Sequence, residues 1–172
     1  DPVQVAEEGL DLLAEHIRET SMLAIWGETG PVAVRWKRGS RLLFASVGLG
    51  TTFPLLNSTT GRLFLALMPR EATKAVLEAE LAQLGKAARK RAEVGLDKML
   101  DQIRRDGLVE AEGHLAPGIW AASAPVFDSQ GQLVAGLTII GLVEDPPAER
   151  RRSVDLVKQA AIEASERLGM TS

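Results

Sequence analysis

The stretch Gly118–Leu142, GIWAASAPVFDSQGQLVAGLTIIGL, decides the fold of this chain. It predicts two antiparallel β-strands joined by a tight turn, because Asp128 and Gly131 stand at the first and last positions where a type I turn favours these residue types. The segments on either side of the turn carry no charged residue. We therefore expect a sheet whose two faces are both covered by other parts of the protein.

Pairing across this hairpin predicts two different faces. With a loop of four residues, Phe127 pairs with Gln132 and Ala121 lies opposite Thr138. One face then consists largely of small or hydroxyl-bearing residues, namely Ile119, Ala121, Ser123, Gly136, Thr138 and Ile140. The other face is bulkier and carries Trp120, Ala122, Ala124, Val126, Leu133, Ala135, Leu137 and Ile139. Small residues in mid-sheet leave room for a helix backbone or for a ligand, and the pattern alone favours neither. A register slip of one residue would exchange the two faces.

Composition and charge are those of an ordinary globular domain. The 172 residues are enough for one domain with a full core, and hydrophobic and charged residues make up 45% and 25% of them. The net charge of −3 gives no reason to expect nucleic acid or an anionic membrane as a partner. Without cysteine the chain has no disulfide, thiol nucleophile or thiolate metal site. No apolar run is long enough to cross a membrane.

The part before residue 48 predicts a helix followed by a meander. An amphipathic helix is expected from Pro2 to about Thr20. Three short strands with turn residues between them follow, at Met22–Trp26, Val32–Trp36 and Leu42–Val47. The chain begins at Asp1 without an initiator methionine, from which we expect it to be an excised part of a longer protein.

The segment Gly48–Pro69 predicts a loop rich in Gly and Thr that leads into a helix capped by Asn57 or Ser58. The first N–H groups of a helix are unpaired, so this is either an anion site or the ordinary cap of a buried helix. Further helices are expected at about 71–84 and at 86–106, the latter ended by Gly107, and after the hairpin, where Asp145 would cap a helix with Pro146 in its first turn. Together these elements predict an α+β fold, with one antiparallel sheet and helices packed on its faces.

His114 lies in a predicted loop close to Glu110 and Glu112. One histidine with two carboxylates could form a metal site or an acid–base pair, so a small enzyme is one alternative function. No activated nucleophile, metal constellation or cofactor fingerprint accompanies these residues, which disfavours it. We expect no catalytic residue, metal or cofactor. A structural oligomerisation module that binds no ligand is a further alternative.

Two stretches resemble the C-terminal ligand-binding domain of IclR-type bacterial transcription regulators. They are PLLNSTTGRLFLALMP (Pro54–Pro69) and DGLVEAEGHLAPGIWAASAPVFDSQGQLVAGLTIIG (Asp106–Gly141), in the correct order and at the correct spacing. The resemblance implies a GAF/PAS-like fold that encloses a small-molecule pocket, in a cytoplasmic protein that forms homodimers or tetramers. It also implies that residues 1–20 form a connecting helix and residues 21–172 the effector-binding domain. Operator DNA would be bound only by an N-terminal winged helix-turn-helix domain absent from this chain.

The resemblance also implies where an effector would bind. The turn before the first pocket helix maps to Thr59 and Thr60, the loop before the hairpin maps near Ala111, and the hairpin contacts map to Ala121, Thr138 and Ile140. Depending on the register, Ser123 would join them. Relatives that bind small keto-acids have polar residues at the positions of Ala121 and Ile140, so the pocket expected here is more apolar. An aromatic or aliphatic acid, or a neutral aromatic molecule, is therefore the expected effector.

Overall fold

The computed structural model describes residues 1–40 and 47–170 as one antiparallel sheet with helices on both faces. Within these residues the strand order is β2-β1-β5-β4-β3. The elements are α1 (Pro2–Ala14), β1 (Thr20–Gly27), β2 (Gly30–Lys37), α2 (Thr59–Leu67), α3 (Arg70–Ala82), α4 (Lys86–Asp106), β3 (Val109–Glu112), β4 (Ile119–Phe127), β5 (Leu133–Leu142) and α5 (Pro147–Arg167). The predicted α+β fold is confirmed. In the described part of the chain, no helix is both long and apolar enough to span a membrane.

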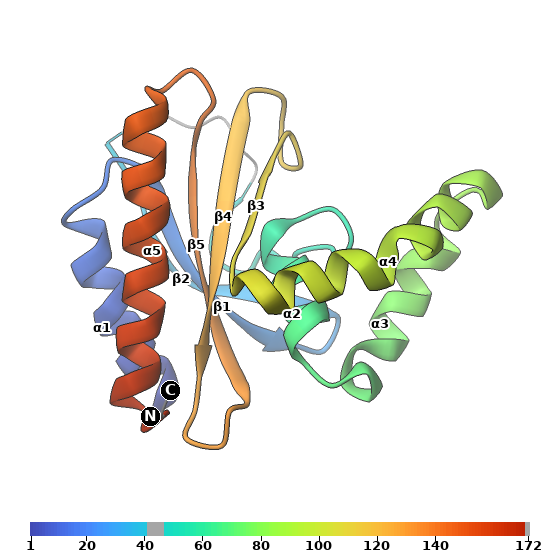
Figure 1. Ribbon diagram of the computed structural model, residues 1–172, viewed down its shortest axis with the longest axis horizontal. Coiled ribbons are helices and arrows are strands. Elements are labelled where there is room, and N and C mark those ends of the chain that lie inside the picture. The colour runs from blue at the N-terminus through green and yellow to red at the C-terminus, as the bar shows by residue number, and fades with distance from the viewer. Residues whose placement is uncertain (41–46, 171–172) are drawn as a thin grey trace.

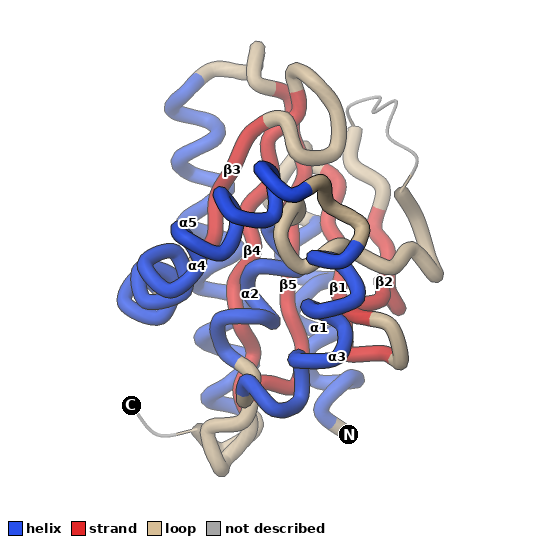
Figure 2. Tube along the Cα trace, turned by 90° about the vertical axis from the view of Figure 1, so that its right-hand side faces the viewer, coloured by secondary structure: helices blue, strands red, loops and turns tan. Residues whose placement is uncertain are grey.

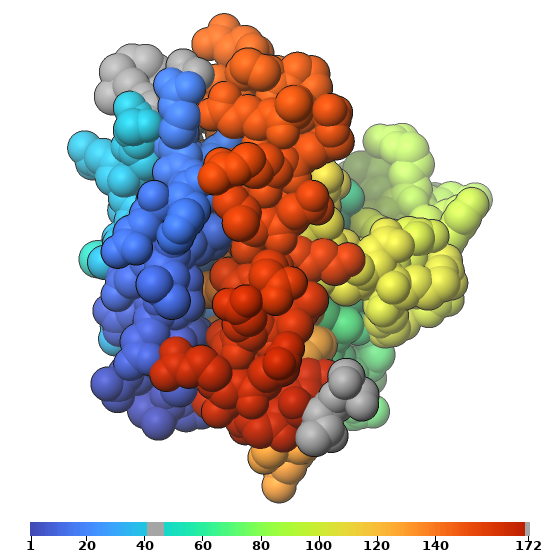
Figure 3. Space-filling model, turned by 60° about the vertical axis from the view of Figure 1, so that its left-hand side comes forward, coloured from blue at the N-terminus to red at the C-terminus, as the bar shows by residue number. Residues whose placement is uncertain are grey.

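The helices cover the sheet unequally. Figure 1 shows α1 and α5 along one face and α2 on the other, with α3 and α4 extending away from the sheet. In the view of Figure 2, α2 lies in front of β4 and β5. On the surface of the molecule, α1 and α5 run side by side (Figure 3). On the face covered by α2, this short helix therefore lies over the small residues of the hairpin.

The turn of the central hairpin forms as predicted, but the loop is longer. The N–H of Gly131 donates to the carbonyl of Asp128 at 3.0 Å, and the Asp128 carboxylate accepts from the N–H groups of Gln130 and Gln132 at 2.9 and 3.0 Å. Phe127 pairs with Leu133 rather than with Gln132. The predicted loop of four residues is thus wrong.

The strand register differs from the prediction by two residues. Ala121 lies opposite Ile140 and Ser123 opposite Thr138, because the register shifts between Val126 and Phe127 as well as at the loop. A shift of two keeps every side chain on its predicted face, since faces alternate with a period of two. The pairing was predicted incorrectly, and the composition of the two faces correctly.

The two faces of the hairpin pack as their compositions indicate. The bulky face, with Trp120, Leu137 and Ile139, forms one core with Leu10 of α1 and Val157 of α5. On the small-residue face, a Cβ added at Gly136 would lie 3.1 Å from the side chains of both Leu63 and Phe64 of α2. This part of the small-residue face therefore serves the close approach of a helix.

Two element boundaries differ from the prediction for local reasons. The first helix ends at Ala14 rather than near Thr20, because Thr20 is extended and pairs with Ile140 of β5. The last helix starts at Pro147 with Pro146 as its N-cap residue, not with Asp145. A residue that precedes proline is pushed out of the helical region, so Pro146 cannot be helical. The predicted strand Leu42–Val47 lies, apart from Val47, outside the described residues.

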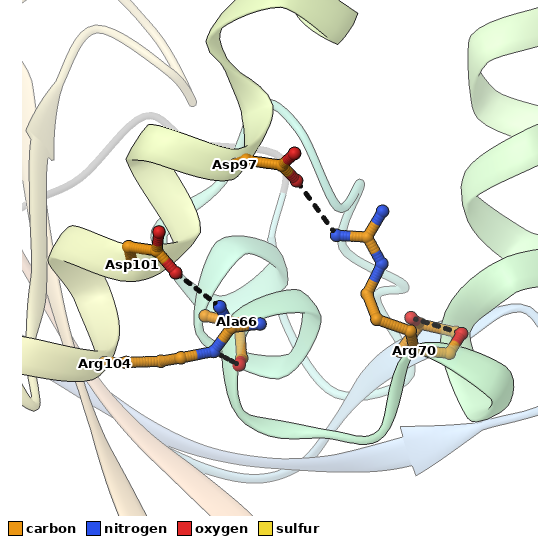
Figure 4. Close-up of polar contacts among 6 residues, drawn as sticks. Ala66, Arg70, Asp97, Asp101 and Arg104 are labelled. Carbon is orange, nitrogen blue, oxygen red and sulfur yellow. Dashed lines mark hydrogen bonds and ion pairs between the residues drawn. The ribbon is translucent and has the colours of Figure 1, made fainter.

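Helix α4 and its C-terminal cap match the prediction, and side chains tie α4 to its neighbours. Gly107 ends α4 with a left-handed backbone, φ 62° and ψ 29°. Arg104 donates to the carbonyl of Ala66, at the end of α2, at 2.8 Å and also pairs with Asp101 at 2.9 Å (Figure 4). An exposed ion pair between Arg70 and Asp97 links α3 to α4. The end of α2 is therefore anchored from outside the sheet.

The outer edge of β4 is closed where β3 no longer covers it. The pairing with β3 reaches only from Trp120 to Ser123. Beyond it stands Pro125, which has no N–H group to offer, and the N–H of Phe127 donates to the hydroxyl of Ser165 on α5 at 2.9 Å. A proline and a side-chain acceptor thus occupy an edge that would otherwise present free donors.

Candidate effector site

The N-terminus of α2 is held tightly against the preceding loop. Ser58 is the N-cap, as predicted, and its hydroxyl accepts from the N–H of Gly61 at 2.8 Å while donating to the carbonyl of Pro54 at 2.8 Å. A Cβ at Gly61 would overlap the Pro54 carbonyl, so only glycine fits there. From α3, both carboxylate oxygens of Glu80 accept the N–H groups of Leu55 and Leu56. Side-chain hydrogen bonds thus hold the loop and the first helical turn together.

Four buried hydroxyl groups connect this turn to the sheet. Thr60 lies 2.7 Å from Thr138, Thr138 lies 2.5 Å from Ser123, and Ser123 donates to Thr59 at 2.9 Å, all measured between hydroxyl oxygens. Each of the four residues is no more than 2% exposed. Ser123 and Thr138 can meet because the observed register places them directly opposite each other.

The directions of these hydrogen bonds follow from counting protons. A hydroxyl group has one proton to donate. Since Ser123 donates to Thr59, Thr138 must donate to Ser123 and Thr60 to Thr138. The proton of Thr59 then has no acceptor among the described residues. In addition, the backbone N–H groups of Thr59 and Thr60 belong to the first helical turn, which has no intrahelical acceptors.

A small cavity opens beside this cluster. Of the residues predicted to contact an effector, five line it, namely Thr59, Thr60, Ala121, Thr138 and Ile140. The space open to the centre of a water molecule is about 10 Å³, enough for roughly one water. Near Ala121 and Ile140 the small-residue face thus borders a cavity, whereas at Gly136 it packs against α2. The two alternatives left open by the sequence are both realised, at different ends of the same face.

Two predicted site residues do not line the cavity. Ser123 is fully buried behind Thr138 and is connected to the wall by hydrogen bonds. Ala111 is half-buried on β3, next to Ala121, which it pairs with. Whether any of these residues contacts an effector stays a prediction.

The cavity is also lined by residues that the sequence analysis did not predict to belong to the site. They are mainly apolar and come from β1, from the loop before α2 and from the loop between β3 and β4, and they include Met22, Phe53, His114 and Leu115. His114 stood out in the sequence only for its chemistry. Its Nδ1 atom is closed to solvent and has no hydrogen-bond partner among the residues that the structure describes. Burial, together with the positive charge of Arg62, lowers the pKa of His114 below its ordinary value.

Arg62 is itself partly desolvated. It follows Gly61 in α2, is half-buried, and donates from Nε to the carbonyl of Leu56 at 2.7 Å. Burial lowers the pKa of its guanidinium group. Arg62 therefore keeps a positive charge near the site without lining the cavity.

The proposed acid–base group around His114 is not assembled. Glu110 and Glu112 accept from Nε and a terminal nitrogen of Arg150 on α5, both at 2.7 Å, and Arg150 lies 4.9 Å from the ring centre of Trp120. Partial burial opposes the charge of Arg150, but the hydrogen bonds with Glu112 and Glu110 raise its pKa. The two carboxylates are thus occupied on the α5 side of β3, whereas His114 lines the cavity on the other side. Within residues 1–40 and 47–170, no three metal-ligating side chains gather at one point.

The fold agrees with the comparisons. The family model described as "Bacterial transcriptional regulator IclR C-terminal" matches residues 1–166. The chain belongs to this family and is an effector-binding domain of the kind found in IclR-type transcription regulators.

HmgR and KipR, two similar proteins, are longer than this chain. The crystal structure of Pseudomonas aeruginosa HmgR is 32% identical and superposes with a TM-score of 0.86, covering 100% of this chain and 68% of HmgR. The transcriptional regulator KipR of Bacillus subtilis is 24% identical over 170 residues, 98% of this chain and 68% of KipR. The C-terminal domain of Escherichia coli KdgR, 23% identical with a TM-score of 0.76, covers 98% of both chains and shares the fold.

Proposed function

We propose that the chain binds a small organic effector in the cavity at the start of α2, and that binding changes the operator affinity of a full-length regulator. The observation that supports this most is the wall made by Thr59 and Thr60. These two residues line the cavity and carry two first-turn N–H groups and one hydroxyl proton for which the described residues supply no acceptor, next to several apolar side chains. Donors without partners next to an apolar wall are what a carboxylate with an organic body requires.

The walls favour an effector with an apolar body. Besides the polar residues of the wall, the lining includes residues without a polar side chain, among them Ala121, Ile140, Ile119, Met22 and Phe53. An aromatic or aliphatic acid, or a neutral aromatic molecule, matches them better than glyoxylate or pyruvate. Such a body would bury apolar surface that a keto-acid of two or three carbons lacks.

Binding must be linked to a change in conformation. The cavity has room for roughly one water, so an effector of this class requires the walls to move apart. A ligand that binds only the opened state shifts the population towards it. This differential affinity is what an effector needs to control a distant DNA-binding domain.

The remaining features of the proposal concern the whole regulator. An N-terminal winged helix-turn-helix domain would bind operator DNA, and residues 1–20 would connect it to the effector domain at residues 21–172. The regulator would act in the cytoplasm as a homodimer or tetramer, without a membrane partner, a cofactor or a catalytic residue. The relatives are transcriptional regulators, which supports sensing rather than catalysis.

Calorimetry with a ligand panel tests the proposal. Benzoate, phenylacetate and hexanoate are titrated into the 172-residue chain, with glyoxylate and pyruvate for comparison. We expect at least one of the larger acids to bind, and Ala121→Leu, which fills the cavity, to weaken it by about tenfold or more. Ala72→Leu, on the exposed surface of α3, is the matched control and should leave binding unchanged.

Three outcomes count against the proposal. Exclusive binding of the two keto-acids would contradict the apolar effector class. Binding that Ala72→Leu weakens as much as Ala121→Leu would place the ligand elsewhere. No binding across the panel, together with stable self-association of the chain, would favour an oligomerisation module without a ligand.

A further inference from the structure

His114 lines the cavity and carries a hydrogen-bonding atom that the structure leaves unused. It lies on the loop between β3 and β4, and its ring is partly buried. The Nδ1 atom is closed to solvent and makes no hydrogen bond within residues 1–40 and 47–170. A buried polar atom without a partner is unfavourable and uncommon in folded proteins. A bound molecule that reaches Nδ1 with a polar group therefore gains a hydrogen bond that the free protein lacks.

The environment of the ring favours its neutral form, which can adapt to its partner. Burial and the nearby charge of Arg62 both act against protonation and lower the pKa of His114. A neutral imidazole has one donor and one acceptor nitrogen, and the tautomer adjusts to the partner. Nδ1 can therefore accept from a hydroxyl group or donate to a carbonyl oxygen.

The other polar groups of the wall have a different character. Thr59 and Thr60 bring two first-turn N–H groups and one hydroxyl proton without an assigned acceptor to the wall. Ala121 and Ile140 add no polar side chain to the wall. A carboxylate satisfies the donors of α2 but leaves Nδ1 of His114 without a partner, unless the body of the ligand carries a second polar group.

We propose that His114 is a specificity-determining residue of the site, which selects acids that carry a hydroxyl or carbonyl group on their apolar body. This rests on the proposed function, because it requires an acid to occupy the cavity. His114 then distinguishes among molecules that the start of α2 binds equally well. A site with a hydrogen-bonding group discriminates against analogues that leave this group unpaired.

Calorimetry with matched pairs of acids tests this proposal. The probes are phenylacetate with its 2-, 3- and 4-hydroxy derivatives, and hexanoate with 6-hydroxyhexanoate. We expect the 172-residue chain to bind at least one hydroxylated acid about tenfold more tightly than its parent. In His114→Phe this ratio should fall to about one while the parent acid still binds. His114→Asn, whose amide keeps a polar group close to the position of Nδ1, should retain part of the preference.

Nuclear magnetic resonance provides a readout in the unmodified chain. There are two histidines, and His16 lies in the exposed turn that follows α1, with Nδ1 2.8 Å from the carbonyl of Leu12. Long-range proton–nitrogen spectra should show the Nδ1 resonance of His114 move with the preferred hydroxylated acid and much less with its parent. His16 serves as the internal reference and should not move.

The outcomes separate this proposal from the proposed function. Equal binding of parent and hydroxylated acids by the wild-type chain, or an unchanged preference in His114→Phe, would overturn the role of His114 and leave effector binding intact. No binding of any acid would overturn both. If His114→Phe does not fold, the Asn variant and the resonance of Nδ1 decide the question.

Discussion

The hydroxyl oxygens of Thr60 and Thr138 lie 2.7 Å apart across 78 positions of the sequence. One belongs to the first turn of α2 and the other to the middle of β5, and both are buried. Helix α2 is therefore held to the sheet by a polar contact as well as by Leu63 and Phe64. The position of the unpaired N–H groups at the start of α2 depends on this contact.

Removing one of these hydroxyls should destabilise the domain. Thr138→Val keeps the shape of the side chain but removes the acceptor of the Thr60 proton and the donor to Ser123, so we expect the free energy of unfolding to fall by about 1–3 kcal/mol. The double variant Thr60→Val/Thr138→Val should cost less than the sum of the single variants, because either single variant already removes the hydrogen bond between the two hydroxyls. Urea unfolding measures all three, and strictly additive losses would contradict the coupling.

Glycine at position 61 should be essential for folding. Gly61→Ala places a methyl group on the Pro54 carbonyl, and we expect a loss of more than about 3 kcal/mol or no folded protein. The matched control is Gly95→Ala in the middle of α4, where an added Cβ has no atom within 4 Å. This control should stabilise the domain by roughly 0.5–1 kcal/mol. Thermal unfolding followed by circular dichroism compares them, and similar effects would contradict the packing at Gly61.

Glu80 should contribute more to stability than Glu78, two residues away on α3. In Glu80→Gln one acceptor oxygen for Leu55 or Leu56 becomes an NH₂ group, and we expect a loss of about 1–2 kcal/mol. Glu78→Gln removes only an exposed ion pair with Arg89 and should cost less than about 0.5 kcal/mol. Urea unfolding at low and at 0.5 M salt tests both, and a salt-sensitive loss at Glu80 would indicate a surface ion pair instead.

The domain should lose stability through His114 as the solution becomes acidic. Its pKa is lowered in the folded state, so between this value and the unfolded pKa of about 6.5 the unfolded chain binds more protons. The contribution is complete above about pH 6.5 and is lost as the pH falls towards the folded pKa. Urea unfolding between pH 7.5 and 5 should show a weaker pH dependence for His114→Phe than for the wild type. A stronger dependence in the variant would contradict the lowered pKa.

The composition of the hairpin faces could be predicted because strand alternation is a local property. The register could not, since the irregularity between Val126 and Phe127 has no signature in the residue types. Because the predicted register was wrong by two residues, Ala121 and Ile140 still lie on the same face of the sheet. Their being directly opposite each other became evident only from the structure.

Residues from separate segments were harder to anticipate. Met22, Phe53 and Leu115 look like ordinary core residues in the sequence, and they meet at the cavity only through tertiary packing. Arg150 belongs to a basic run that we would place in solvent, yet it binds two carboxylates of β3, 38 and 40 positions away. Such partners are set by how α5 lies on the sheet, which no local pattern records.

The closed edge of β4 has a consequence for how this protein behaves when it is concentrated. A strand from another molecule cannot extend the sheet at that end, because Pro125 offers no N–H and Ser165 already occupies the N–H of Phe127. The exposed edge of an apolar strand such as β4 can otherwise pair with a strand of another molecule, and repeated pairing of this kind builds fibres. The ring of Pro125 and the hydroxyl group of Ser165 thus keep this part of an apolar hairpin from serving as a template for aggregation.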